Sequence, residues 1–194
     1  MLSPNEVYVS CDIEADGPIP GPNSMLSLGA TAFDHEGGYL STFQRNVCPL
    51  EYAHPHPNTV VWWSKHPDAY AAATKDPLGA SDVMHEFVRW VQSISGQKRS
   101  VFCAFPAGYD FMWVYWYLMR FIGKSPFSHS ALDIKTLAMV GMDSGYREAI
   151  KRNMPRHWFS SQNKHKHESA ADSLEQGDLM FNIVKAIGST NATA

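Results

Sequence analysis

Two carboxylates, two positions apart, are the first residues of the chain whose types and spacing could do chemistry. Asp12 and Glu14 end an alternating apolar segment typical of a β-strand, so their side chains are expected on one face near its carboxyl end. Two negative charges held this close raise each other's pKa unless a cation lies between them. The pair is therefore a candidate site for Mg²⁺ or Mn²⁺, which prefer oxygen ligands, rather than Zn²⁺. The alternative is an exposed Asp-x-Glu with nothing bound, because so short a motif is common.

A third acid, Asp110, stands in an unusual place for a charge. It follows an apolar segment and a Pro-Ala-Gly turn, and it opens the most apolar helix that the sequence predicts. Its structural role would be an N-terminal helix cap, worth about 1 kcal/mol. Alone it does not indicate a site.

The fourth acid lies near the start of the last predicted helix, in the segment HKHESAADSLEQGD. If this helix begins near Ser169, Asp172 lies in its first turn, where the helix dipole favours a negative charge. His167 then lies in the loop before the helix, so that an imidazole stands near a carboxylate. The alternative is a solvated loop rich in His and Lys.

The order and setting of these five residues resemble the DEDDh family of 3′→5′ exonucleases, the superfamily of RNase T, oligoribonuclease and the proofreading exonuclease of DNA polymerase III. Asp12 and Glu14 match the first motif, Asp110 matches the second, and His167 with Asp172 matches the third. A pentad matched in order is far more specific than any of its parts. The resemblance extends from about residue 7 to residue 187.

Other segments refine this resemblance. Residues 132–138 resemble the segment of the family in which a strand leads into a helix between the second and third motifs. The Trp62-Trp63 pair resembles a feature of a bacterial and phage branch of the family that is described as exoribonuclease-like. Two features depart from the family. Pro106 stands where the second motif usually has Asn, and the loop of residues 15–24 is longer than the usual turn.

The resemblance implies a cofactor of two divalent ions, Mg²⁺ or Mn²⁺, and a two-metal hydrolysis of phosphodiesters. Asp12, Glu14 and Asp172 would bind the ion that carries the attacking water, with Asp12 bridging to the second ion. Asp110 is expected to reach its ion partly through water. The implied general base is His167, whose pKa near neutrality suits proton transfer, with His165 as the rival.

Candidate substrate contacts lie on both sides of these acids. Met25, with Leu26, follows the Pro-rich loop and is expected to form an apolar wedge for a terminal base, although packing in the second strand is an equal alternative. Lys164 and Lys166 flank the proposed base, and a solvated basic face is the alternative for them. Further basic residues nearby are Lys151, Arg152 and Arg156.

The expected substrate is the 3′ end of single-stranded RNA or DNA. We favour RNA or short oligonucleotides, because the net charge of −3 argues against a surface that holds long duplexes. An exodeoxyribonuclease and a non-catalytic nucleic-acid-binding module on the same fold remain alternatives. A zinc enzyme built on His54-Pro55-His56 and His165-Lys166-His167 is a further one, disfavoured because the first group lies in an irregular loop.

Length and composition place these residues in one folded unit. The 194 residues, 44% hydrophobic and 18% charged, predict a single exonuclease domain over residues 1–188 and a disordered tail over 189–194. No apolar run is long enough to cross a membrane, and the N-terminus lacks a secretory pattern, so a cytoplasmic location is expected. Three cysteines without a CxxC fit a reducing compartment. A homodimer is expected only because the small relatives commonly form one.

The elements that must position the acids follow an α/β order. Three strands come first and are expected to form an antiparallel meander, and helices then alternate with two further strands. The resemblance implies an RNase H-like fold, a mixed sheet with helices on both faces, in which the first strand is central. Strands are expected at residues 7–12, 25–33, 39–47, 101–105 and 131–134, and helices at 59–65, 68–74, from 81, 110–122, 135–142 and 169–187.

Overall fold

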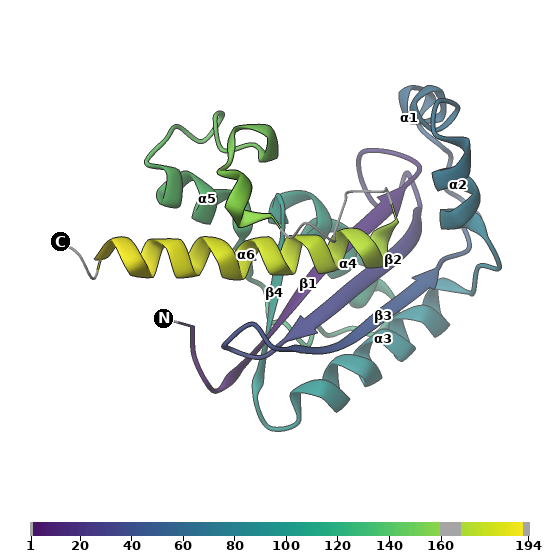
Figure 1. Cartoon of the computed structure of the whole chain (residues 1–194). Helices are drawn as coiled ribbons and strands as arrows, with labels where there is room; N and C mark the ends of the chain where they lie inside the picture. The colour runs from purple at the N-terminus through teal and green to yellow at the C-terminus, as the bar shows by residue number, and fades with distance from the viewer. Residues whose placement is uncertain (1, 160–167, 192–194) are drawn as a thin grey trace.

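A five-stranded mixed sheet organises the computed structural model, which describes residues 2–159 and 168–191. The strand order is β3-β2-β1-β4-β5; β1 pairs antiparallel with β2 and parallel with β4, so it lies at the centre, as expected (Figure 1). The elements are β1 (Glu6–Ala15), β2 (Met25–Phe33), β3 (Tyr39–Asn46), α1 (Pro57–Trp63), α2 (Pro67–Thr74), α3 (Ala80–Ser95), β4 (Arg99–Ala104), α4 (Ala107–Phe121), β5 (Ala131–Asp133), α5 (Ile134–Met142), η1 (Lys151–Asn153), η2 (Arg156–Trp158) and α6 (Ser169–Asn191).

Two apolar layers cover the faces of the sheet. Side chains alternate along β1, so Val9 and Cys11 pack with α3 and α4, whereas Tyr8 packs on the opposite face with residues of α6 such as Leu179 and Phe181. Asp12 and Glu14 have the same parity as Tyr8, which places them on the face that α6 crosses (Figure 1). The alternation therefore determines which helix the two acids meet.

Helix α6 approaches β2 unusually closely at Gly29. A Cβ atom at this glycine would lie 2.1 Å from the carbonyl carbon of Ser169, far inside van der Waals contact. On either side of it the hydroxyls of Ser27 and Ser169 are 2.8 Å apart, and those of Thr31 and Ser173 are 2.9 Å apart. The absent side chain and the two hydroxyl pairs together fix the first turns of α6 against the sheet.

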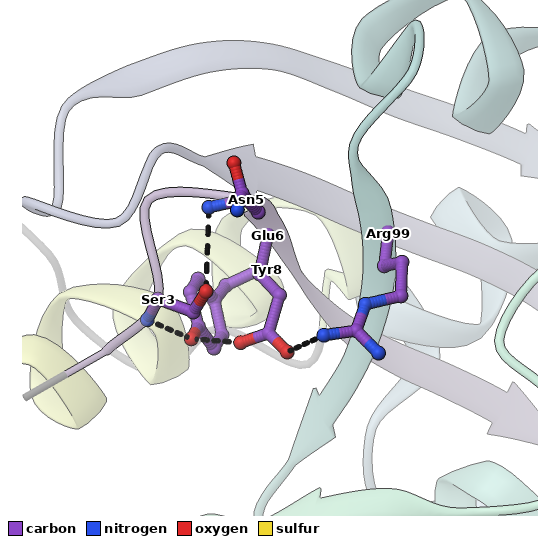
Figure 2. Close-up of polar contacts among 5 residues, drawn as sticks. All are labelled: Ser3, Asn5, Glu6, Tyr8 and Arg99. Carbon is purple, nitrogen blue, oxygen red and sulfur yellow. Dashed lines mark hydrogen bonds and ion pairs between the residues drawn. The ribbon is translucent and has the colours of Figure 1, made fainter.

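The beginning of β1 is tied to the beginning of β4 by polar contacts (Figure 2). The Tyr8 hydroxyl donates to Glu6 Oε2 at 2.6 Å and accepts from the backbone N–H of Ser3 at 3.1 Å. Arg99 Nη2 lies 3.7 Å from Glu6 Oε1, an exposed ion pair that contributes little. These contacts lie at the end of β1 remote from Asp12 and Glu14.

Several expected boundaries differ from those in the structure. α4 begins at Ala107, three residues before Asp110, so the N-cap position belongs to Pro106 and Asp110 lies inside the first turn. α3 begins at Ala80 with Gly79 as its N-cap, and Ser81 is therefore inside the helix rather than capping it.

The end of the chain also differs from the expectation. α6 continues to Asn191, so the first three residues of the expected tail are helical; no proline follows Ile187 to end the helix earlier. The segment from residue 143 onward, which the sequence left unassigned, contains η1 and η2. No helix in the described ranges combines the length and hydropathy that a bilayer crossing requires.

Candidate metal centre

Three of the expected metal ligands converge at one end of β1. Asp12, Glu14 and Asp172 each offer a carboxylate oxygen, and these three oxygens all lie within 4.8 Å of one another. β1 supplies the first two because its regular pairing continues to Glu14, which is opposite Ser27 of β2. α6 supplies the third, because Ser27 and Gly29 hold its first turns against the same strand.

Asp110 joins this group through the backbone of β1. Its Oδ1 accepts a hydrogen bond of 3.1 Å from the N–H of Ile13, the peptide that lies between the two acids of β1. The side chain is buried, with the whole residue 4% exposed. The start of α4 is held in turn by Asp133, whose Oδ1 accepts from the Ala107 N–H at 2.9 Å while its Oδ2 caps α5 at Thr136. Asp110 is thus directed at the centre and does not occupy the N-cap position.

The four acids destabilise one another in the absence of a cation. Burial, followed by the charges of Asp110, Glu14 and Asp172, raises the pKa of Asp12 well above its ordinary value. Burial is also the main reason that the pKa of Glu14 rises to about 8. It likewise raises the pKa of Asp110 to about 7, and the hydrogen bond from the Ile13 N–H acts in the opposite direction. Buried carboxylates with raised pKa values are characteristic of functional sites.

The donor set fits a hard divalent cation. Three carboxylates within reach of one another match the oxygen ligands that Mg²⁺ and Mn²⁺ take. In the described part of the chain this is the only group of three or more His, Cys, Asp or Glu side chains with ligand atoms that close, and it contains neither His54 nor His56. The zinc alternative therefore has no support from the described residues.

Among the described residues, the ammonium group of Lys151 compensates part of this negative charge. Lys151 of η1 lies 2.5 Å from Glu175 Oε2, and its charge lowers the pKa of both Asp12 and Asp110. Glu175 is buried on α6, so its carboxylate depends on Lys151 for its counter-ion. The short helix η1 thereby brings a cation to the edge of the acidic group.

Sequence reasoning missed Gln176, which contacts the centre directly. Its Nε2 donates to Asp12 Oδ1 at 2.6 Å, and its Oε1 accepts from the N–H of Phe105 at 2.9 Å. The available signal was its position four residues after Asp172, which puts both side chains on one face of a helix. A glutamine at this spacing does not by itself indicate a functional site, so the position of Gln176 becomes informative only once the acidic group has been located.

The expected substrate residues fall into two groups. Lys164, Lys166, His165 and His167 lie outside the described residues, so their roles stay predictions. Met25 is fully buried in the layer beneath α3 and α4, and its backbone N–H donates to the Tyr117 hydroxyl at 2.8 Å. In this position the Met25 side chain cannot stack on a base.

A bulge in β2 explains why the neighbour of Met25 points the other way. Glu14 pairs with Ser27 and Ala15 with Met25, so Leu26 is the extra residue, and Met25 falls on the face of Leu28. Leu26 instead lines an apolar pocket of about 390 Å³ next to the end of β1. Other lining residues are Asp16, Ala53, Val60, Trp63 and Tyr70.

Hydrogen bonds hold this pocket beside the acidic group. Trp63 Nε1 donates to the carbonyl of Ala15 at 3.0 Å, which fixes α1 to the end of β1. Asp16 Oδ1 accepts from the N–H of Ser24 at 2.6 Å and so closes the long loop between β1 and β2. The lining of the apolar pocket therefore begins at Asp16, two residues after Glu14 in the chain.

Comparison with known proteins agrees with this arrangement. Residues 7–184 match the 3′-5′ exoribonuclease Rv2179c-like domain. The chain belongs to this exoribonuclease-like family. It is also 32% identical, over 142 residues that cover 71% of this chain and 70% of the relative, to the 3′-5′ DNA exonuclease Cap18 of Escherichia coli. The two names differ in the nucleic acid that they specify.

Solved structures share the fold of this Rv2179c-like chain. The nuclease domain of 3′hExo, a DEDDh family member bound to rAMP, superimposes with a TM-score of 0.66 at 11% identity and covers 92% of both chains. E. coli exonuclease I in complex with a dT13 oligonucleotide gives a TM-score of 0.67 at 13% identity, covering 97% of this chain and 43% of that one. S. pombe Pop2p in its Mg²⁺- and Mn²⁺-bound form gives 0.59 at 17% identity, covering 91% and 82%. The expected RNase H-like fold and the DEDDh resemblance are confirmed.

Proposed function

We propose that this member of the Rv2179c-like family removes nucleotides from the 3′ ends of single-stranded nucleic acid with the help of two divalent ions. The observation that carries the proposal is the convergence of Asp12, Glu14 and Asp172, whose carboxylate oxygens lie within 4.8 Å of one another. Membership of a 3′-5′ exonuclease family supports the direction of the reaction.

The proposed chemistry divides among the residues of the site. Bound Mg²⁺ or Mn²⁺ would supply an activated water and neutralise the charge that develops on the phosphoryl oxygens. Asp12, Glu14 and Asp172 would hold these ions, and Asp110 would complete the set from α4. His167 would take the proton from the attacking water, with His165 as the rival for that role.

The preferred substrate is single-stranded RNA or a short oligonucleotide. The family match to exoribonucleases supports this preference, as does the net charge of −3, which disfavours binding of long duplexes. Exodeoxyribonuclease activity is the second candidate, because Cap18, a DNA exonuclease by name, is 32% identical to this chain. Homodimer formation and a cytoplasmic location stay predictions from the sequence.

Hydrolysis of labelled single strands tests the function and the choice of sugar together. RNA and DNA of equal sequence, labelled at the 5′ end, are incubated with Mn²⁺ or Mg²⁺, and a ladder that shortens from the 3′ end is expected, faster for RNA. Asp12→Asn is the control and should produce no ladder. Faster shortening of DNA would replace the RNA preference with the second candidate.

Two further results would reject the catalytic proposal itself. Binding of single strands without any cleavage in Mn²⁺ or Mg²⁺ would favour the non-catalytic module. Activity that requires Zn²⁺ and survives Asp12→Asn would favour a zinc enzyme built on histidines.

The apolar pocket is proposed to hold the terminal base. Every base has a flat aromatic face, so stacking accepts any base, and a pocket lined by Leu26, Trp63 and Tyr70 suits such a face. Tyr70 and Trp63 have their ring centroids 5.4 Å apart, so they form one aromatic wall. Of the two residues expected to form the apolar wedge, Met25 and Leu26, only Leu26 lines this pocket.

Tyr70→Ala is expected to raise KM for oligonucleotides about 5- to 150-fold with little change in kcat, because a stacked base is worth about 1–3 kcal/mol. Tyr70 is half-exposed, so the melting temperature should change little. Steady-state kinetics on the preferred substrate measure both constants. Tyr39→Ala, an exposed tyrosine of edge strand β3, is the matched control and should leave KM unchanged. An unaltered KM in Tyr70→Ala would remove this pocket from substrate binding.

A further inference from the structure

Gln176 is a buried residue whose side-chain amide contacts one of the four acids, Asp12. It lies on α6 one turn after Asp172 and is 2% exposed. Its two polar atoms are both used: Nε2 donates to Asp12 Oδ1 at 2.6 Å and Oε1 accepts from the Phe105 N–H at 2.9 Å. The Gln176 side chain therefore links α6, to which the residue belongs, with β1 and with the residue that follows β4.

The chemistry of the two partners determines the orientation of this amide. As a metal ligand Asp12 would be an ionised carboxylate, which only accepts hydrogen bonds, so the group that faces it must be the NH₂. A backbone N–H only donates, so the group that faces Phe105 must be the carbonyl oxygen. If the amide were reversed, its NH₂ would face the Phe105 N–H, donor against donor, and its oxygen would face the Asp12 carboxylate, acceptor against acceptor. Gln176 is consequently locked in one orientation, with its donor directed at Asp12.

We propose that Gln176 is a positioning residue that holds the carboxylate of Asp12 in the rotation required for metal binding; this inference rests on the proposed function. A hydrogen bond to Asp12 Oδ1 restricts rotation of the carboxylate and occupies a lone pair that would otherwise face the interior. Hydrogen-bond partners of metal-binding side chains commonly set both the orientation and the affinity of a metal site.

The second hydrogen bond of Gln176 makes this support rigid. Phe105 follows β4 directly, and β4 is the parallel neighbour of β1 in the sheet. Anchoring the amide to Phe105 fixes the position of its donor relative to the strand that carries Asp12. The hydroxyl pairs Ser27–Ser169 and Thr31–Ser173, by contrast, join α6 to β2.

Gln176→Met separates positioning from packing. Methionine has a similar length and no amide, so the variant keeps the volume and loses both hydrogen bonds. Titration of the metal-free protein with Mn²⁺ in a calorimeter, without nucleic acid, should show affinity about 10- to 100-fold weaker than that of the wild type. The melting temperature in chelator and the circular dichroism spectrum are recorded on the same samples.

Asn182→Leu is the matched control for loss of an amide hydrogen bond on α6. Its Nδ2 donates to the carbonyl of Trp158 at 2.9 Å, six residues beyond Gln176 on the same helix. It is expected to lower the melting temperature while Mn²⁺ affinity stays within about twofold. If Gln176→Met does not fold, Gln176→Asn serves instead, because the shorter amide cannot reach both partners and should weaken Mn²⁺ binding similarly.

Three outcomes decide the proposal. Weaker Mn²⁺ binding in the Gln176 variant but not in Asn182→Leu supports positioning. Wild-type affinity in a folded Gln176 variant, or an equal loss in Asn182→Leu, overturns it and leaves Gln176 a structural residue. Failure of the proposed function is recognised separately, since wild-type protein would then show no Mn²⁺ binding that Asp12→Asn removes.

Discussion

Glu14→Gln is expected to lower nuclease activity more than about 100-fold. In the absence of metal, the same change is expected to make the protein more stable than the wild type at pH 8. Loss of a partner of a metal ligand already costs about 10- to 100-fold, so loss of a ligand should cost more. The gain in stability has a separate cause. The Glu14 carboxylate is half-buried beside the charges of Asp172 and Asp110, and glutamine of the same shape carries no charge for them to repel.

The direction of the pH dependence follows from the raised pKa. Glu14 has a folded-state pKa of about 8 against an ordinary value of 4.5, so between these values the folded state binds more protons than the unfolded state. The contribution of Glu14 to stability is therefore lost as pH rises through this window. Asp110, with its pKa raised to about 7, acts in the same direction. The melting temperature of the metal-free wild type should fall between pH 5 and pH 8.

Melting curves in chelator at several pH values, with and without added Mn²⁺, measure this effect. The wild-type curve should fall with pH, and the Glu14→Gln curve should fall less steeply. Added Mn²⁺ should restore the stability of the wild type at pH 8 and have a much smaller effect on the variant. Glu51→Gln, at an exposed acid, is the control and should follow the wild type throughout. A Glu14→Gln protein that is less stable than the wild type at pH 8 would contradict the account of mutual repulsion.

Gly29→Ala is expected to displace α6 and so to inactivate the site without touching any of the acids. The new methyl group would lie 2.1 Å from the Ser169 carbonyl carbon and 2.3 Å from the Ala170 nitrogen, both backbone atoms that cannot rotate away. Overpacking of this kind costs about 1–3 kcal/mol. A shift of about 1 Å in Asp172 relative to Asp12 and Glu14 can reduce the rate about 100-fold.

Gly188→Ala provides a control on the same helix. A Cβ at Gly188 meets nothing within 4 Å, and alanine has the higher helix propensity, so this variant should be at least as stable as the wild type and fully active. Chemical denaturation and single-turnover cleavage measure the two effects. Full activity in Gly29→Ala would mean that the contact between α6 and β2 does not set the position of Asp172.

Much of the fold and of the acidic group could be predicted from the sequence because both rest on local patterns. Strand alternation places Asp12 and Glu14 on one face, and a helix start near Ser169 places Asp172 in a first turn; α6 begins at that residue. The order of the acids along the chain then specifies one family and, through it, a central first strand. These are inferences from period and order, which a single sequence contains.

The remaining details depend on contacts between distant segments, which a single sequence does not contain. The bulge at Leu26, which turns Met25 into the core, arises from the pairing of β2 with β1. The use of Gln176 depends on where β4 ends. The backbone φ of Gly29 does not require glycine. The reason that no side chain fits at this position is the packing of α6 against it, which the sequence alone does not show.

The hydrogen bond between Gln176 and Asp12 joins residues 164 positions apart. The centre can therefore form only after nearly the whole chain has been synthesised and its last helix has docked. A nascent or truncated polypeptide that lacks α6 carries three of the four acids, lacks Asp172, and cannot complete the acidic group. Release of hydrolytic activity is in this way delayed until folding is finished.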